Sequence, residues 1–256
     1  HSSHRRQRQM CIRDRKADPG YFGPNSMMWK VNKEITVLFG GARALLMHAA
    51  HPLIAAGARQ TSFYQRDPWK RLIRTLSLQN SVTFGTIEEA NDSATRINRL
   101  HEVIKGKDEV TGGYYDALDH EQLLWVHACL QISSIYFYEK TVRKLTDDEK
   151  NQYHDENMVS AKLVLIDIDK TPKTHEELKR WVMEKSRDKN YLRLTDVAKD
   201  VQDIISGGPV PKHIKPIWPF ISFTAFNTLP DEFKKLYGVK SSKFKSLLLA
   251  LSLIHI

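Results

Sequence analysis

Residues 90–106 read ANDSATRINRLHEVIKG, and this stretch predicts a helical fold. Small or apolar residues and one histidine recur three or four positions apart, so they share one stripe of a helix: Ala90, Ala94, Ile97, His101 and Ile104. An imidazole on such a stripe has two interpretations. It is either a core histidine satisfied by a hydrogen bond, or a ligand to a buried centre such as a haem iron. Taken alone, the stripe favours the core histidine.

Both ends of the chain read as translated sequencing adapter. The run from Met10 to Asp14 and the last six residues match the two strands of one common adapter, so we expect residues 1–15 and 251–256 to be adapter-derived and 16–250 to form one domain. Without residues 1–15, which hold five Arg and one Asp, the net charge falls from +9 to +5. That balance is too mild to argue for a nucleic-acid partner. Cys129 becomes the only cysteine, which excludes an internal disulfide.

The organisation of the chain predicts an all-α domain. Helices are expected over residues 32–60, 69–78, 86–105, 120–145, 146–164, 174–185 and 195–205, followed by short pieces over 214–237. Pro52 should kink or split the first helix, and Asp67 with Pro68 should begin the second. No stretch alternates as a strand does, and residues 114–116 are interpreted as a loop.

The helix expected over residues 32–60 is apolar but contains polar residues, and these bear on whether it crosses a membrane. The stretch from Val37 to Ala58 carries Arg43, His48 and His51, so it is interpreted as a buried helix rather than a membrane span. We therefore expect a soluble domain, either cytoplasmic or membrane-associated. His48 and His51 are three apart, yet no third ligand lies nearby, and His51 more simply marks the Pro52 kink, its imidazole bonding a freed backbone carbonyl.

Two further groups of residues have the chemistry of a site. Arg71, Arg74 and Thr75 are spaced to share a helix face, which is either a solvated basic face or a pair of fixed donors aimed at an anionic group or a polarised oxygen. His127 stands in the sequence LWVHACL, on a helix that is apolar nearly all round and hence central. For His127, a core role and a role in a haem pocket are equally consistent with the residues.

These motifs occur in an order that resembles a known family. The ordered set comprises Gly23-Pro24-Asn25-Ser26-Met27-Met28-Trp29, Arg43-Ala44-Leu45-Leu46, Ala50-His51-Pro52, Asp67-Pro68-Trp69-Lys70-Arg71-Leu72, Arg74-Thr75, Phe84-Gly85-Thr86, His101-Glu102-Val103-Ile104-Lys105-Gly106 and Trp125-Val126-His127. The set is similar to the oxygenase family of MpaB and latex clearing protein, the rubber oxygenase. The resemblance runs from about Gly23 to Leu130.

The resemblance implies a single globin-like helical domain that encloses a non-covalent haem b. His101 falls on the iron ligand, and Arg71, Arg74 and Thr75 fall on the cluster at the opposite, catalytic face. His127 and His51 are further candidates for contact with the haem. The rubber-cleaving branch has a lysine where this chain has Arg74, and arginine cannot lose its proton to ligate iron. The resemblance therefore implies a distal site that is open or holds water.

The implied function is a haem-dependent oxygenase that uses dioxygen to attack a C=C bond in a hydrophobic, lipid-like substrate such as an isoprenoid. Because of Arg74, rubber is not the favoured substrate. Two other functions remain: a haem-binding protein without turnover, and a helical module that binds a lipid or partner without haem. The pair Arg71 and Arg74 favours the oxygenase, since a passive haem binder needs no two distal cations.

Overall fold

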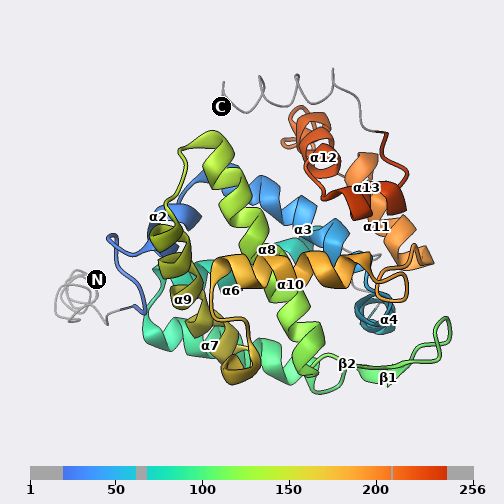
Figure 1. Ribbon diagram of the computed structural model, residues 1–256, viewed down its shortest axis with the longest axis horizontal. Coiled ribbons are helices and arrows are strands. Elements are labelled where there is room, and N and C mark those ends of the chain that lie inside the picture. The colour runs from blue at the N-terminus through green and yellow to red at the C-terminus, as the bar shows by residue number, and fades with distance from the viewer. Residues whose placement is uncertain (1–19, 62–67, 209, 241–256) are drawn as a thin grey trace, which may run out of the picture.

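The computed structural model describes residues 20–61, 68–208 and 210–240, and within these the side chains of residues 68–75 lie outside the description. The fold is mainly helical, as the sequence predicts (Figure 1). The elements, in chain order, are α2 (Met27–Asn32), the 3-10 turn η1 (Ile35–Leu38), α3 (Phe39–Ala49), α4 (Pro52–Thr61), α6 (Pro68–Phe84), α7 (Ile87–His101), β1 (Lys105–Lys107), β2 (Tyr114–Asp116), α8 (His120–Thr141), α9 (Asp147–Leu163), η2 (Ile168–Lys170), α10 (His175–Arg187), α11 (Asp196–Gly207), α12 (Trp218–Asn227) and α13 (Asp231–Leu236).

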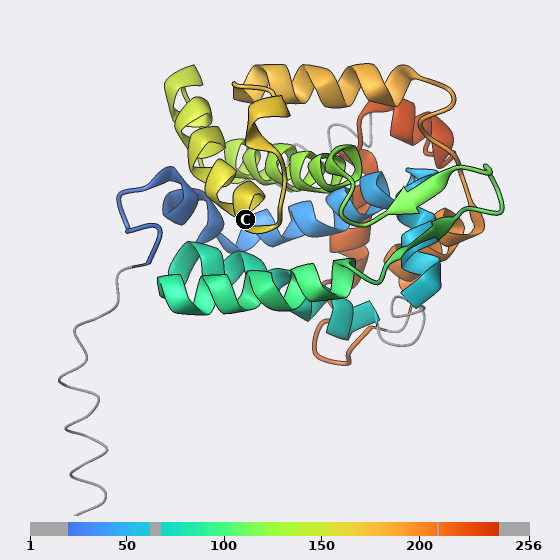
Figure 2. The same ribbon diagram turned by 90° about the horizontal axis from the view of Figure 1, so that it is seen from below.

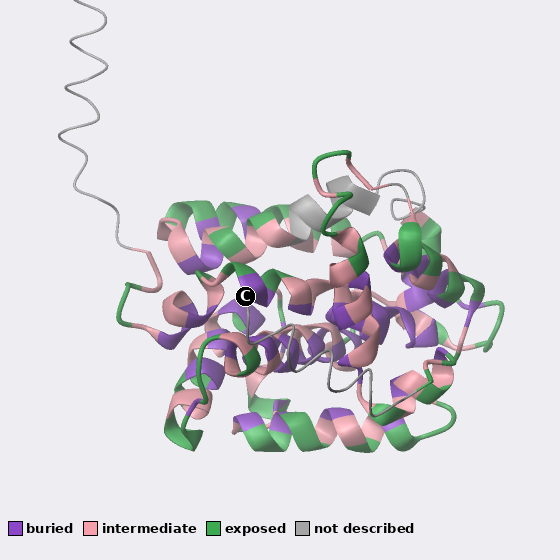
Figure 3. Ribbon diagram, turned by 90° about the horizontal axis from the view of Figure 1, so that it is seen from above, coloured by how far each residue is buried: buried purple, intermediate pink, exposed green. Residues whose placement is uncertain are grey.

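Helix α8 is the centre of the fold. It crosses the middle of the molecule and packs most extensively against α3, while α9, α10 and η1 also contact it (Figure 1). Trp125 and Phe137 are fully buried and Tyr138 is nearly so, which confirms them as core residues. Buried residues gather on the inner helices, and the outer faces of the surrounding helices are exposed (Figure 3). The apolar character of α8 on all sides follows from this position.

The expected split at Pro52 is confirmed as a sharp corner. The segment Ile35–Ala49 and helix α4 meet at 102°, with His51 and Pro52 at the corner. Proline suits the first position of α4 because that position needs no N–H donor. No described helix is by itself long and apolar enough to cross a membrane; Ile35–Ala49 and Pro52–Thr61 meet the criteria of length and composition only as a bent pair.

Helices α6 and α7 form an antiparallel hairpin along one side of the molecule (Figure 2). Thr86 begins α7 with a capping box, because its side chain accepts from Glu89 N–H while the Glu89 carboxylate accepts from Thr86 N–H. The predicted bounds were wrong at two points. Helix α6 runs on to Phe84 rather than ending near residue 78, and α7 ends at His101 rather than near residue 105. The cap expected at Asp67 lies outside the described residues.

The expectation that strands are absent was wrong. Residues 105–107 and 114–116 pair as an antiparallel hairpin, with Gly106 opposite Tyr115. The buried Asp108 carboxylate accepts from the backbone N–H and the hydroxyl of Thr111, which fixes the turn between the strands. Strands of three residues are too short to give a recognisable alternation. Tyr114–Asp116, interpreted as a loop, is the second strand.

A buried arginine joins three helices at the core. Arg43 of α3 is 5% exposed; its Nε donates to Thr228 O at the end of α12 (3.0 Å), and its Nη1 donates to Ser133 Oγ of α8 (2.6 Å). The guanidinium also lies 5.0 Å from the ring centroid of Tyr136. Burial lowers the pKa of Arg43 to about 10, so it stays charged at neutral pH. The carbonyl end of α12 is the negative end of that helix dipole, which stabilises this charge.

Candidate functional site

His101 is the last residue of α7, where the helix meets the β-hairpin. The inner stripe predicted for this helix is confirmed for Ala90 and Ala94, which are buried. The Nδ1 atom of His101 is buried and has no hydrogen-bond partner within the described residues. Burial lowers the pKa of His101 below its ordinary value, so the imidazole is neutral at neutral pH. A neutral imidazole with an unsatisfied nitrogen can serve as a metal ligand.

The α6–α7 hairpin brings the backbone of the basic cluster to the same level as His101. Arg71 and His101 each lie roughly 14 residues from the turn, or about 20 Å along the helix axes, at the open end of the hairpin. Arg74 and Thr75 lie one turn closer to the closed end. The side chains of Arg71, Arg74 and Thr75 are outside the described residues, so the fold places their backbones alone.

His127 lies on α8, on the side that faces α9. Its Nε2 atom is buried and has no hydrogen-bond partner within the described residues. Burial, and to a lesser extent the nearby His154 of α9, lower the pKa of His127 to about 4. His127 is therefore a second neutral imidazole with an unused buried nitrogen. The sequence could not distinguish this from a satisfied core histidine.

His51 is engaged in the corner between α3 and α4. Its Nδ1 accepts from Ile54 N–H at 3.4 Å, and its ring stands edge-to-face on Tyr191 with centroids 4.5 Å apart. The imidazole therefore caps the start of α4 as an acceptor through Nδ1, and the expected bond to a freed backbone carbonyl stays a prediction for its other nitrogen. Burial lowers the pKa of His51 to about 4. Within the described residues His51, His101 and His127 neither hydrogen-bond to nor stack on one another.

Two buried side-chain amides in the same region were not singled out by the sequence. Asn98 of α7 donates its Nδ2 to Leu163 O of α9 (2.9 Å), and Gln131 of α8 pairs its Nε2 with Nδ1 of His154 (3.0 Å). In each amide the oxygen is buried and has no partner within the described residues. Gln131 is four residues after His127 and so shares its helix face. The spacing of four residues was the sequence signal that Gln131 lies beside His127. Because amide side chains are common on core helices, this spacing alone does not predict a binding site.

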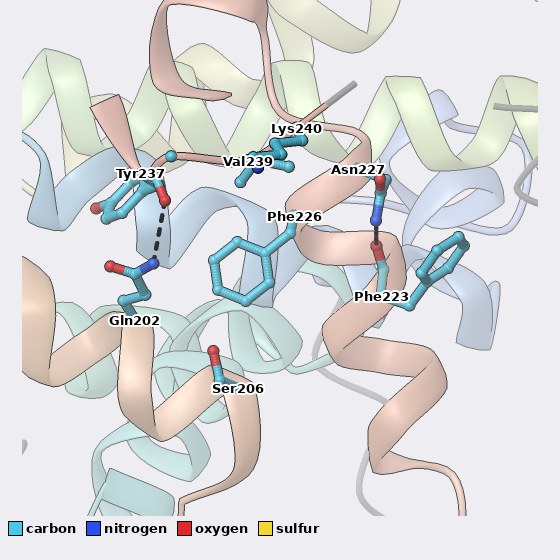
Figure 4. Close-up of a pocket in the computed structure, with 9 residues that line it drawn as sticks. Gln202, Ser206, Phe223, Phe226, Asn227, Tyr237, Val239 and Lys240 are labelled. Carbon is cyan, nitrogen blue, oxygen red and sulfur yellow. Dashed lines mark hydrogen bonds between the residues drawn. The ribbon is translucent and has the colours of Figure 1, made fainter. Parts of the chain in front are cut away.

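Two hollows lined by described residues lie away from these histidines. One, of about 440 Å³, is formed by α11, α12 and the segment after α13; Figure 4 shows Phe226 and Ser206 in its lining and the Gln202 amide donating to Tyr237 O. The other, of about 500 Å³, lies at the closed end of the α6–α7 hairpin beside Arg96 and Phe84. Neither contains a residue that the sequence singled out as functional.

The described residues contain no cluster of three or more His, Cys, Asp or Glu side chains able to hold a metal ion. That result bears on bare metal ions, which need several protein ligands, and not on haem, which needs one. Within the described residues the fold is thus a helical domain with single neutral histidines, each with one buried ring nitrogen that has no hydrogen-bond partner there, on helices α7 and α8.

The particular family follows from the sequence comparison. The chain belongs to the family described as ER-bound oxygenase mpaB/B'/rubber oxygenase, catalytic domain, whose profile matches residues 29–254. The resemblance drawn from the motifs is confirmed, and the match extends it beyond Leu130 to nearly the whole chain. No curated protein and no solved structure matches the chain. The domain is accordingly an oxygenase catalytic domain and an oxidoreductase.

Proposed function

We propose that this domain is a haem b-dependent oxygenase that cleaves or oxidises a C=C bond in a hydrophobic substrate such as an isoprenoid. The observation that carries the proposal is the neutral His101 at the open end of the α6–α7 hairpin, whose buried Nδ1 has no partner among the described side chains and backbone. Membership of the oxygenase family supports the reaction class. A buried imidazole nitrogen without a partner costs about 1–3 kcal/mol, which a bound group can offset.

The side chains of the candidate site residues are of the kinds that bind haem. His101 would hold the iron, since neutral imidazole is a common ligand of haem iron. Arg71 and Arg74 would bind the propionates or another anionic group of the site, because guanidinium groups bind carboxylates in a fixed geometry. His127 would contribute its free Nε2 to the pocket wall. His51 already uses Nδ1 as a helix cap, so only its other nitrogen is available.

When bound, the haem supplies the electron transfer and dioxygen chemistry that side chains lack. The protein's part is positioning and exclusion of water. Arg71 and Arg74 would supply fixed positive charge where negative charge develops during the reaction, and Thr75 would supply a hydroxyl donor beside them. Arg74 keeps its proton throughout, so it acts as a donor and never as a ligand. A hydrophobic substrate bound beside these residues would exclude water from the reacting groups.

The visible absorption spectrum of the chain after haem reconstitution tests this function. We expect a Soret band that is lost or shifted in His101→Ala, and dioxygen consumption with an alkene that falls in Arg71→Ala and Arg74→Ala. A well-folded chain without a Soret band would favour the alternative function of a helical module that binds a lipid or partner without haem. A Soret band without alkene-dependent oxygen uptake would leave the non-catalytic haem binder. A band unchanged by His101→Ala would move the ligand to another histidine.

A further inference from the structure

The orientation of the buried amide of Gln131 is fixed by its neighbours. His154 of α9 places Nε2 2.9 Å from the carbonyl oxygen of Pro172. A carbonyl can only accept, so His154 must carry its proton on Nε2 and leave Nδ1 bare. Burial lowers the pKa of His154, in keeping with a neutral ring. Gln131 must then donate its Nε2 to that bare Nδ1, and its oxygen points away from His154.

This arrangement leaves a fixed acceptor beside an imidazole. Gln131 is 2% exposed, and its Oε1 has no partner within the described residues. His127 Nε2, one helical turn earlier on the same face of α8, is also buried and unsatisfied. No hydrogen bond joins the two atoms within the described residues, so Gln131 Oε1 can accept a hydrogen bond from a third group, and His127 Nε2 can accept one or donate one according to its tautomer.

The chemistry of the pair selects the kind of group that fits. A hydroxyl both donates and accepts, so it satisfies Gln131 Oε1 and either tautomer of His127. A carboxylate cannot donate, and it would face the amide oxygen as a second acceptor.

Asn98 shows the same arrangement on the neighbouring helix α7. Its Nδ2 donates to Leu163 O, again a pure acceptor, so its buried Oδ1 is fixed as the free acceptor. Asn98 lies one turn before His101. Helices α7 and α8 both contact α9, and each carries a side-chain amide whose oxygen is oriented by the hydrogen bond of its nitrogen. Asn98 Nδ2 donates to Leu163 O, and Gln131 Nε2 donates to His154 Nδ1.

We propose that His127 Nε2 and Gln131 Oε1 bind a hydroxyl group on an otherwise hydrophobic substrate, so that the enzyme takes an alkene alcohol in preference to an alkene carboxylate. This inference names the substrate class of the proposed oxygenase and rests on that function. Gln131 touches the substrate, and His154 is the positioning residue behind it.

Binding of three matched ten-carbon probes tests the proposal: geraniol (an alcohol), geranic acid (the carboxylate) and myrcene (a hydrocarbon). Affinities are measured by titration calorimetry on the full chain, with and without haem. We expect Gln131→Met to weaken geraniol about tenfold, because the hydrogen bond from the hydroxyl to Gln131 Oε1 is lost, and to change myrcene less than twofold. In the unsubstituted chain geraniol should bind more tightly than geranic acid.

Gln152→Met is the matched control, since Gln152 is an exposed glutamine on α9 whose amide bonds Glu156. If Gln131→Met does not fold, His127→Phe removes the other polar atom of the pair and leaves the bond from Gln131 Nε2 to His154 Nδ1 in place; it should weaken geraniol about tenfold and change myrcene less than twofold. The proposal is overturned if geraniol does not bind, if geranic acid binds as tightly, or if Gln131→Met leaves geraniol unchanged or weakens myrcene equally. Geraniol binding without a Soret band would refute the haem function alone. Alkene oxidation that is insensitive to Gln131→Met would refute this inference alone.

Discussion

Acidification from pH 7 to pH 5 should destabilise this fold strongly, because burial lowers the pKa values of several of its histidines, most of all those of His51, His127 and His175. Burial lowers the pKa values of His51, His127 and His175 to about 4, against an ordinary value of 6.5. Between these two pKa values the unfolded chain binds more protons than the folded chain does, so the free energy of unfolding falls as the pH falls. The stabilisation is complete above pH 6.5 and is lost as the pH approaches 4.

The magnitude follows from the two pKa values. Between pH 7 and pH 5, one histidine whose pKa is shifted from 6.5 to about 4 costs roughly 2 kcal/mol of unfolding free energy, and three such histidines cost roughly 6 kcal/mol together. That is a large share of the 5–15 kcal/mol typical of a domain. Most carboxylates titrate below this window, so the histidines dominate it.

Urea unfolding followed by circular dichroism at pH 7, 6 and 5 measures the effect. His175→Gln should lower the pH dependence by about a third, and His213→Gln, at an exposed position, should leave it unchanged. Stability that stays level between pH 7 and pH 5 would refute the reasoning. So would an equal effect of the two substitutions, because the dependence would then not come from buried rings.

Three further predictions concern stability and use the same unfolding assay. Arg43→Met should cost roughly 3 kcal/mol, because it removes two charge-assisted hydrogen bonds that join α3 to α8 and α12; a loss under 1 kcal/mol would contradict that role. Leu165→Gly should stabilise the fold by up to about 1 kcal/mol, since Leu165 has φ +67° and is 55% exposed; destabilisation would show that its side chain matters more than its backbone. Thr146→Ala should cost about 1 kcal/mol by breaking the capping box of α9, whereas Thr95→Ala, at an exposed position inside α7, should cost little.

Local signals predicted the local structure well. Thr86 and Thr146 begin helices with the capping boxes that their sequences indicate, and Asp119 caps α8. Pro52 separates α3 from α4 as expected. Each of these features depends on residues within a few positions of one another, so periodicity and capping rules suffice to find them.

Features that depend on distant partners were beyond these rules. The strand at Tyr114–Asp116 exists because it pairs with residues 105–107 around the Asp108 turn, and α4 packs against it. His51 accepts a hydrogen bond from Ile54 N–H at Nδ1, and only the corner geometry decides this. His101 and His127 were predicted as candidates, but the sequence could not tell that one nitrogen of each is buried without a partner, nor that Gln131 is oriented by Pro172.

The distance between Arg71 and His101 in the candidate site depends on the angle between α6 and α7, which is set at the far, closed end of the hairpin. Its closed end is tight at Gly85, where an added Cβ would come within 2.6 Å of Ser81 O and 2.9 Å of Glu89 Oε2. The open end lies about 20 Å away. A change of roughly 5° in the angle between the two helices therefore displaces the backbone of Arg71 relative to that of His101 by about 2 Å. Reacting groups tolerate errors of about 1 Å at most before rates fall steeply. A substitution at Gly85 could therefore disable chemistry at the far end of the hairpin while leaving every residue there in place.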